Sequence, residues 1–160
     1  MPTMLQVLHW FSLAFWVGGM GVFSFVMTPA IFKNLPREEA GKVVGILFPG
    51  YWVVGYVATG LAFVSYLGLR HFSTEAVVAD KARLALLILA LVGVGINGLG
   101  IGPQTRALKQ QIRAATTQEA IAPLQKKFGA LHGISMLVNL TIIVAGLAFL
   151  VLAAARPIRI

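Results

Sequence analysis

The sequence contains no cysteine, and only five of its 160 residues are Asp or Glu. The absence of cysteine excludes disulfides, thiolate metal sites and cysteine nucleophiles. No acidic residue lies in any of the long apolar runs, so these runs hold no carboxylate that could act as a general base or a proton relay. The chain also lacks a phosphate-cradling glycine loop and a nucleophile beside a base at a diagnostic spacing. We therefore expect a protein that is not an enzyme.

Charge is also scarce, because only 11% of the residues are charged, whereas 58% are hydrophobic and the mean hydropathy is +0.85. Four runs carry no charged residue at all: 1–32, 43–69, 84–105 and 128–155. Each run exceeds the roughly 20 residues that a helix needs to cross about 30 Å of hydrocarbon. The runs are continuous and do not alternate as barrel strands do. The sequence predicts an all-α, integral membrane four-helix bundle in one domain, with spans at about 4–28, 45–69, 84–102 and 129–154.

Prolines mark the expected ends of two spans. Pro29 is expected to end the first helix, and Pro103 is expected to end the third. In the long connection between the third and fourth spans, Leu108, Ile112 and Ala115 recur at helical spacing among basic and polar residues. This pattern predicts an amphipathic helix that lies at the membrane interface and is broken near Pro123.

Four spans place both termini on one face of the membrane, here named side A, and the other face is side B. Side B carries eight Lys and Arg residues and side A carries five. The excess of basic residues places side B in the cytoplasm and both termini outside. The net charge of +8 comes from basic residues in the connections between spans. Their expected partner is a bilayer with anionic headgroups, and no nucleic acid is expected.

A polar stripe interrupts the last apolar run. His132, Ser135 and Asn139 are spaced by three and four residues, so they share one face of a helix. Asn139 would lie about 15 Å into the membrane and needs a partner there. Asn97 in the third span is the expected neighbour. Two interpretations stay open: a hydrogen-bond clamp that fixes helix packing, and a path for a solute or ion that ends at His132.

Two further interpretations involve a cofactor. Met136, one turn beyond His132, and Met27 on the same side of the membrane could bind Cu(I) together with the imidazole. His9, followed by Trp16 and a pair of glycines, resembles the start of copper-resistance D-like proteins and of membrane protoporphyrinogen oxidases that bind a b-type haem. His9 and His132 cannot share one haem, because they enter from opposite sides and lie about 15–20 Å apart. No cofactor is expected, and haem b and copper are the alternatives.

Two stretches, LPREEAGKVVGILFPGY at 35–51 and FGALHGISMLVNL at 128–140, carry a family resemblance. They resemble the paired signatures of the family named for transmembrane protein 205, which comprises small four-span membrane proteins and includes a bacterial branch. The sequence departs from the family pattern at Ala40, where an aromatic residue is usual. The resemblance implies a bacterial cytoplasmic (inner) membrane location and a connection with solutes or soft metals.

Both signatures lie on side B, where we expect a polar vestibule. Its candidate residues come from three of the spans and the first connection: Arg37, Pro49, Tyr51, Asn97, His132, Ser135 and Asn139. The expected function is to bind or move a small solute or a soft metal ion through this vestibule. The alternatives are a noncatalytic accessory subunit, which packs against other membrane subunits or against copies of itself, and haem binding through His9.

Overall fold

The structure is a computed structural model that describes residues 2–72 and 78–155. Its described part contains four long helices, at 2–34, 37–72, 78–114 and 118–155. The first comprises α1 (Pro2–Leu13), η1 (Ala14–Gly19), α2 (Met20–Val22), η2 (Phe23–Met27) and α3 (Thr28–Asn34). The second is α4 (Arg37–Phe72), and the third comprises α5 (Val78–Gly95), η3 (Ile96–Ile101) and α6 (Gly102–Ala114). The fourth is α7 (Gln118–Ala155), and the η segments are π-helical.

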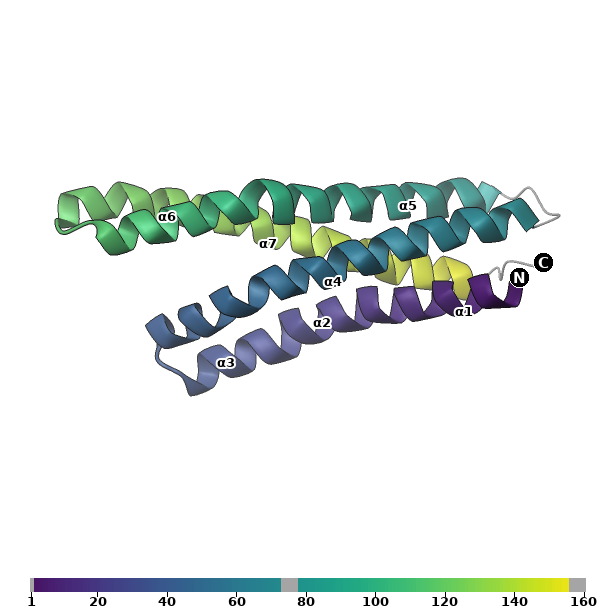
Figure 1. Cartoon of the computed structure of the whole chain (residues 1–160), viewed down its shortest axis with the longest axis horizontal. Helices are drawn as coiled ribbons and strands as arrows, with labels where there is room; N and C mark the ends of the chain where they lie inside the picture. Colours follow the sequence, from purple (N-terminus) through teal and green to yellow (C-terminus); the bar gives the residue numbers. More distant parts are fainter. Residues whose placement is uncertain (1, 73–77, 156–160) are drawn as a thin grey trace.

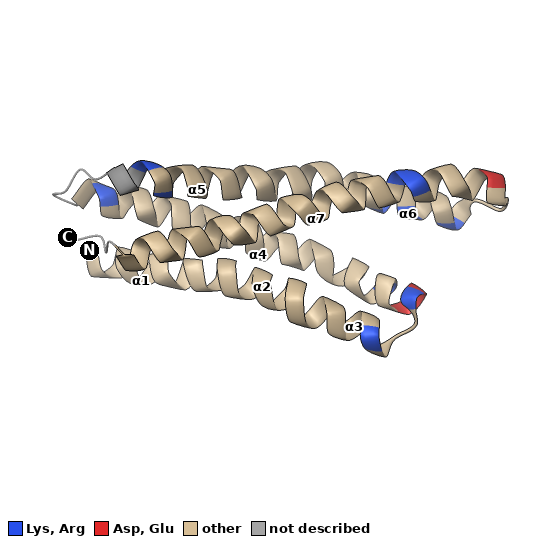
Figure 2. Ribbon diagram, turned by 180° about the vertical axis from the view of Figure 1, so that it is seen from behind, with Lys and Arg blue, Asp and Glu red and all other residues tan. Residues whose placement is uncertain are grey.

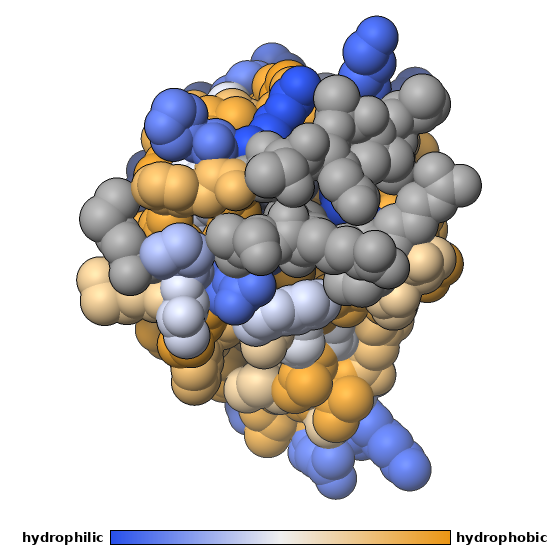
Figure 3. All heavy atoms as spheres, turned by 90° about the vertical axis from the view of Figure 1, so that its right-hand side faces the viewer, coloured by the Kyte–Doolittle hydropathy of each residue, from blue (hydrophilic) through white to orange (hydrophobic). Residues whose placement is uncertain are grey.

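The four long helices form an antiparallel bundle (Figure 1). Helix α1 packs against α4, α4 against α5, α5 against α7, and η1 closes the ring by contacting α7. All four are long and apolar enough to cross a membrane, and each contains one of the predicted spans. In the view from the terminal end, hydrophobic side chains reach the outline of the bundle on several sides (Figure 3). The prediction of an all-α, integral membrane four-helix bundle is confirmed.

The predicted end of the first helix at Pro29 was wrong, because the helix continues to Asn34. Proline normally breaks a helix, since it lacks an N–H and its ring meets the carbonyl group four residues earlier. Here that carbonyl belongs to Phe25, inside the π-helical segment η2. The wider π turn changes the hydrogen-bond register just before Pro29, so the ring is accommodated within a continuous helix.

The same arrangement recurs at Pro103, which does not end the third helix as predicted. It follows the π-helical segment η3, and the helix continues through α6 to Ala114. The predicted interfacial helix is therefore no separate element: α6 prolongs the third helix and packs along α7. Pro123, where a break was predicted, lies inside α7. It is in the second turn of that helix, where few intrahelical N–H bonds are lost.

Large apolar side chains and small residues together form the core between the helices. Trp16, Tyr66 and Phe149 are fully buried in it. A Cβ atom on Gly93 of α5 would lie 2.7 Å from Cγ1 of Ile142 on α7, closer than real side chains approach. The bare backbone at Gly93 therefore lets α5 and α7 pack closely, as small residues do in membrane helix pairs.

Charged residues lie at the two ends of the bundle and leave its middle bare (Figure 2). On side B, α3 and the start of α4 diverge from α6 and the start of α7 (Figure 1, Figure 2). On side A the helices stay together. The helices are thus close together at the end that carries the termini and splayed at the opposite end (Figure 1).

Candidate functional site

Three polar side chains from three helices meet where the helices begin to diverge. The Tyr51 hydroxyl of α4 donates a hydrogen bond of 2.5 Å to Oδ1 of Asn139 on α7. The Nδ2 group of Asn139 donates to Oγ of Ser24 in η2 at 3.0 Å. The Ser24 and Tyr51 hydroxyls are themselves 3.2 Å apart. The closed triangle satisfies polar groups that would otherwise be costly in hydrocarbon.

One turn away on α7, the third helix joins the same region. Asn97 in η3 is 1% exposed and donates through Nδ2 to the backbone oxygen of Ser135 at 3.0 Å. All four long helices therefore contribute a polar group to one continuous region of the bundle. We call it the interior polar cluster, and its members are Ser24, Tyr51, Asn97, Ser135 and Asn139.

The other amide atom of Asn97 has acceptor capacity that the cluster does not use. Its Oδ1 is buried and has no hydrogen-bond partner among the described residues. A buried acceptor left without a donor costs roughly 1–3 kcal/mol. Rotating the amide by half a turn would not help, because Oδ1 would then face the Ser135 oxygen that Nδ2 now contacts. The cluster therefore offers one open acceptor to a molecule with an N–H or O–H group.

Aromatic rings surround the Tyr51 end of the cluster. The centroids of Phe23 and Trp52 lie 4.6 Å and 4.8 Å from that of Tyr51, and the centroid of Phe48 lies 5.9 Å away. Tyr51 and Trp52 are buried, and Phe23 is 9% exposed. These rings lower the local dielectric constant and so strengthen the hydrogen bonds of the triangle.

The remaining candidates from the sequence do not join the cluster. His132 is exposed and stacks on Phe128, with ring centroids 5.9 Å apart and planes inclined by 5°. Arg37 and Pro49 are also exposed. The structure thus brings together Tyr51, Asn97, Ser135 and Asn139, and leaves three candidates outside: Arg37, Pro49 and His132.

The methionines proposed for copper lie at the surface. Met27 is 43% exposed and Met136 is 60% exposed. Across residues 2–72 and 78–155, no group of three or more His, Cys, Asp or Glu side chains is placed to hold a metal ion. A copper site there would rest on thioether sulfurs that face outward and on the stacked imidazole of His132.

His9 belongs to a second polar region, near side A. Its side chain is 3% exposed, and Nδ1 lies 3.1 Å from the Ala62 oxygen and 3.0 Å from the Ser65 hydroxyl. The rings of Tyr66 and Phe149 pack against the imidazole, with centroids 6.1 Å and 5.5 Å away. A haem ligand must present a nitrogen to an open face wide enough for a porphyrin. The packing around His9 does not fit such a group.

Sequence reasoning missed several inward-facing polar residues, among them Ser24, which is half-buried, and Arg83, which is buried. Ser24 was passed over as part of an apolar run, although it is the polar residue within FSFVM and lies about 15 Å along the helix from Asn34. Ser24 and Asn139 lie at similar depths in the membrane, and this similarity could have indicated that they meet. Arg83 is 3% exposed and donates through Nη2 to the Leu152 oxygen at 2.6 Å. Its position at the edge of a span gave no sign that it turns inward.

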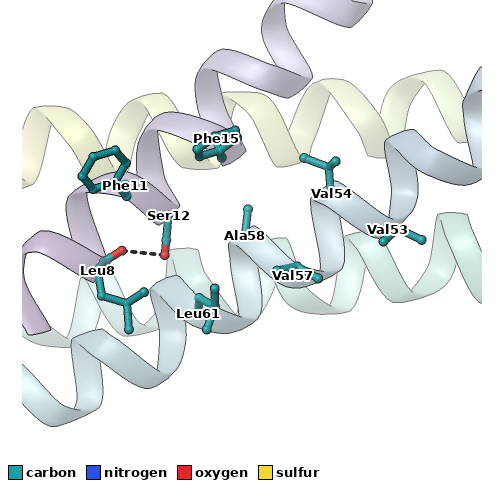
Figure 4. A pocket seen from close by; sticks show the side chains of 9 residues that line it. All are labelled: Leu8, Phe11, Ser12, Phe15, Val53, Val54, Val57, Ala58 and Leu61. Carbon is teal, nitrogen blue, oxygen red and sulfur yellow. Dashed lines mark hydrogen bonds between the residues drawn. The ribbon is translucent and has the colours of Figure 1, made fainter.

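An apolar groove lies on the outer side of the bundle, between α1 and α4 (Figure 4). It has a volume of about 410 Å³. Leu8, Phe11 and Phe15 line one wall, and Val53, Val57 and Leu61 line the other. The only side-chain oxygen in its lining is that of Ser12, which donates to the Leu8 backbone at 2.6 Å. The groove suits hydrocarbon and offers no polar contact of its own.

Four apolar helices around an interior polar cluster define a small helical integral membrane protein. The chain belongs to the family described as "Domain of unknown function (DUF4149)", which matches residues 11–114. A protein of Aquifex aeolicus (strain VF5), described as an uncharacterized protein, is 32% identical over 131 residues, which cover 82% of this chain and 83% of the relative. No solved structure matches the chain. The likeness to the transmembrane protein 205 family stays a resemblance, because neither match bears that name.

Proposed function

We propose that this membrane protein binds a small polar solute at the interior polar cluster and lets it reach the cluster from side B. The buried Oδ1 of Asn97, which has no partner among the described residues, is the observation that carries the proposal. A clamp that only holds helices together needs no spare acceptor. A solute with N–H or O–H groups would pair with it and remove the cost of burying it.

The arrangement of the helices supports access from side B. The helices diverge on that side of the cluster and stay together on the other (Figure 1). Ser24 and Asn97 both lie in π-helical segments, η2 and η3, and such segments are frequent at functional sites. A solute is favoured over a soft metal ion, because the cluster consists of hydroxyl and amide groups, whereas Met27 and Met136 are exposed.

Proteoliposomes test this proposal, with glycerol and urea as uncharged probes that carry O–H or N–H donors. Stopped-flow light scattering measures how fast the vesicles swell when each probe enters. We expect the full-length protein to accelerate swelling over protein-free vesicles, and Asn97→Leu and Asn139→Leu to remove most of the acceleration. Thr141→Val is the matched control, since Thr141 is exposed on the same helix and its hydroxyl bonds only to the Leu137 oxygen in the described structure. The proposal would be refuted if vesicles that contain the wild-type protein swelled no faster than protein-free vesicles.

An accessory subunit is the second candidate, and the surface of the first helix favours it. Phe11, Phe15 and Phe25 are 60–63% exposed on that helix. Aromatic side chains on a membrane helix serve either lipid contact or packing against another helix. Cross-linking in native membranes separates the two candidates: a partner subunit recovered with every preparation supports the accessory role, and a chain that is always alone contradicts it.

A further inference from the structure

Lys109 of α6 reaches toward α4 and α7 on side B, where these helices diverge. Its Nζ group is 3.4 Å from the backbone oxygen of Gly41 on α4 and 5.5 Å from the ring centroid of Phe128 on α7. The Nζ group packs against the backbone of α4 at Gly45, because a Cβ atom on that residue would lie 3.5 Å from it. Lys109 is half-buried, so its ammonium group is partly withdrawn from solvent between the diverging helices.

The charge of this ammonium group is not balanced by a carboxylate in the described part of the chain. The acidic side chains that the structure describes are Glu38, Glu39 and Glu119, and all three are exposed. The single ion pair found among the described side chains joins Glu38 to Lys42 at 2.7 Å. An ammonium group has three N–H donors, and Lys109 uses one of them in a long bond to a neutral oxygen. A partly desolvated cation with donors to spare favours an anion beside it.

The position of Lys109 along its helix places it near lipid headgroups. It lies seven residues beyond Gly102, the predicted end of the third apolar span, which corresponds to about 10 Å along the helix. Arg106 and Arg113 are three residues before it and four residues after it, so the three basic side chains share one face of α6. Figure 2 shows basic residues on this part of α6. Basic pockets between membrane helices are typical binding sites for lipid phosphates.

We propose that Lys109, supported by Arg106 and Arg113, binds a phosphate group between α4, α6 and α7. Two sources can supply this group, the headgroup of an anionic lipid and free phosphate, and the depth of the site favours the lipid. A Cβ atom on Gly41 would meet nothing within 4 Å, so the surface of α4 beside Nζ has open space for phosphate oxygens. The site is distinct from the interior polar cluster and does not depend on the passage of a solute.

Thermal unfolding of the full-length protein in detergent tests the proposal. The additives are phosphatidylglycerol, zwitterionic phosphatidylcholine, and inorganic phosphate against chloride at equal ionic strength. We expect a saturable rise of the unfolding midpoint with phosphatidylglycerol that is absent with phosphatidylcholine. In Lys109→Met the apparent Kd for phosphatidylglycerol should be at least about tenfold weaker, which corresponds to about 1.4 kcal/mol. A saturable rise with inorganic phosphate that Lys109→Met abolishes would also support the site and identify free phosphate as its occupant.

Matched variants separate this site from general charge effects. Lys42→Met removes a charge on the same side of the membrane, from a side chain that is 52% exposed and paired with Glu38, and it should bind like the wild type. Lys109→Arg should also bind, whereas Gly45→Leu should weaken binding, because its side chain would take the place that Nζ now holds against α4. If Lys109→Met does not fold, Gly45→Leu and Lys109→Arg decide the question. Equal responses to both lipids, or equal loss in Lys42→Met and Lys109→Met, would overturn the proposal. Asn139→Leu should still show the rise of the unfolding midpoint with phosphatidylglycerol. The lipid proposal and the solute proposal can therefore fail independently of each other.

Discussion

Removing the Tyr51 hydroxyl is the sharpest test of the hydrogen-bonded triangle. In Tyr51→Phe the ring stays, so the packing against Phe23 and Trp52 is preserved. Oδ1 of Asn139 loses the donor that contacts it at 2.5 Å, while Nδ2 keeps its bond to Ser24 at 3.0 Å. The variant therefore removes the hydrogen bond between α4 and α7, together with the 3.2 Å contact of the Tyr51 and Ser24 hydroxyls, and leaves the Asn139 acceptor without its donor.

The expected magnitude follows from burial and from the groups left behind. Hydrogen bonds between membrane helices average about 0.6 kcal/mol and reach about 1.7 kcal/mol. An acceptor stranded in a buried site costs roughly 1–3 kcal/mol. Tyr51 is 7% exposed and Asn139 is half-buried, so we expect Tyr51→Phe to cost about 1–2 kcal/mol of unfolding free energy. Asn139→Leu should cost less, because the Ser24 and Tyr51 hydroxyls, 3.2 Å apart, can still pair with each other.

A double-mutant cycle with Tyr51→Phe and Asn139→Leu measures the interaction. Unfolding is followed by circular dichroism in mixed micelles as the denaturing detergent increases. We expect a coupling energy of about 0.5–1.5 kcal/mol between the two sites. Thr141→Val should change the unfolding free energy by less than about 0.5 kcal/mol, as substitutions outside such networks do. A coupling energy of zero, or a Thr141→Val effect as large as that of Tyr51→Phe, would refute the reasoning.

The remaining predictions concern helix packing and His9. Gly93→Ala should cost about 1–3 kcal/mol, because its methyl group would meet the buried side chain of Ile142, whereas Gly95→Ala, with nothing within 4 Å, should be neutral or stabilise by up to about 1 kcal/mol. The same detergent titration measures both variants, and equal effects would contradict the close approach of α5 and α7. The visible absorption spectrum of the purified protein should lack a Soret band, because the rings of Tyr66 and Phe149 pack against His9. A Soret band that His9→Ala removes would contradict this packing.

The sequence predicts the four helices well and their ends poorly. Runs without charge locate the spans, because hydrocarbon excludes charge whatever the packing. The helix ends depend on the backbone hydrogen bonding around each proline, which the residue type alone does not reveal. Pro29 and Pro103 look like breakers in sequence, yet each follows a π-helical segment that accommodates the proline ring.

The sequence also predicts some of the polar contacts and misses others. The spacing of Ser135 and Asn139 predicts that they share a helix face, and Asn97 does contact Ser135. The spacing also groups His132 with them, and His132 does share the helix face of Asn139, seven residues later. It is nevertheless exposed, because it lies nearer side B, where the helices diverge (Figure 1). In the sequence, Lys109 is one basic residue among several on side B. Its contact with the Gly41 oxygen cannot be predicted there, because the two residues are 68 positions apart in the chain.

The short turns on side B bear on how the protein is assembled during synthesis. Leu35 and Pro36 alone separate α3 from α4, and residues 115–117 alone separate α6 from α7. Each half of the chain is therefore a helical hairpin whose partners are neighbours in sequence, and such local contacts form early and fast. The first hairpin is complete once residue 72 has left the ribosome, whereas the Tyr51–Asn139 bond must wait for the second. The contacts of Asn139 with Tyr51 and Ser24 are thus made last, when two finished hairpins meet in the membrane, whereas the Ser24–Tyr51 and Asn97–Ser135 contacts each lie within one hairpin.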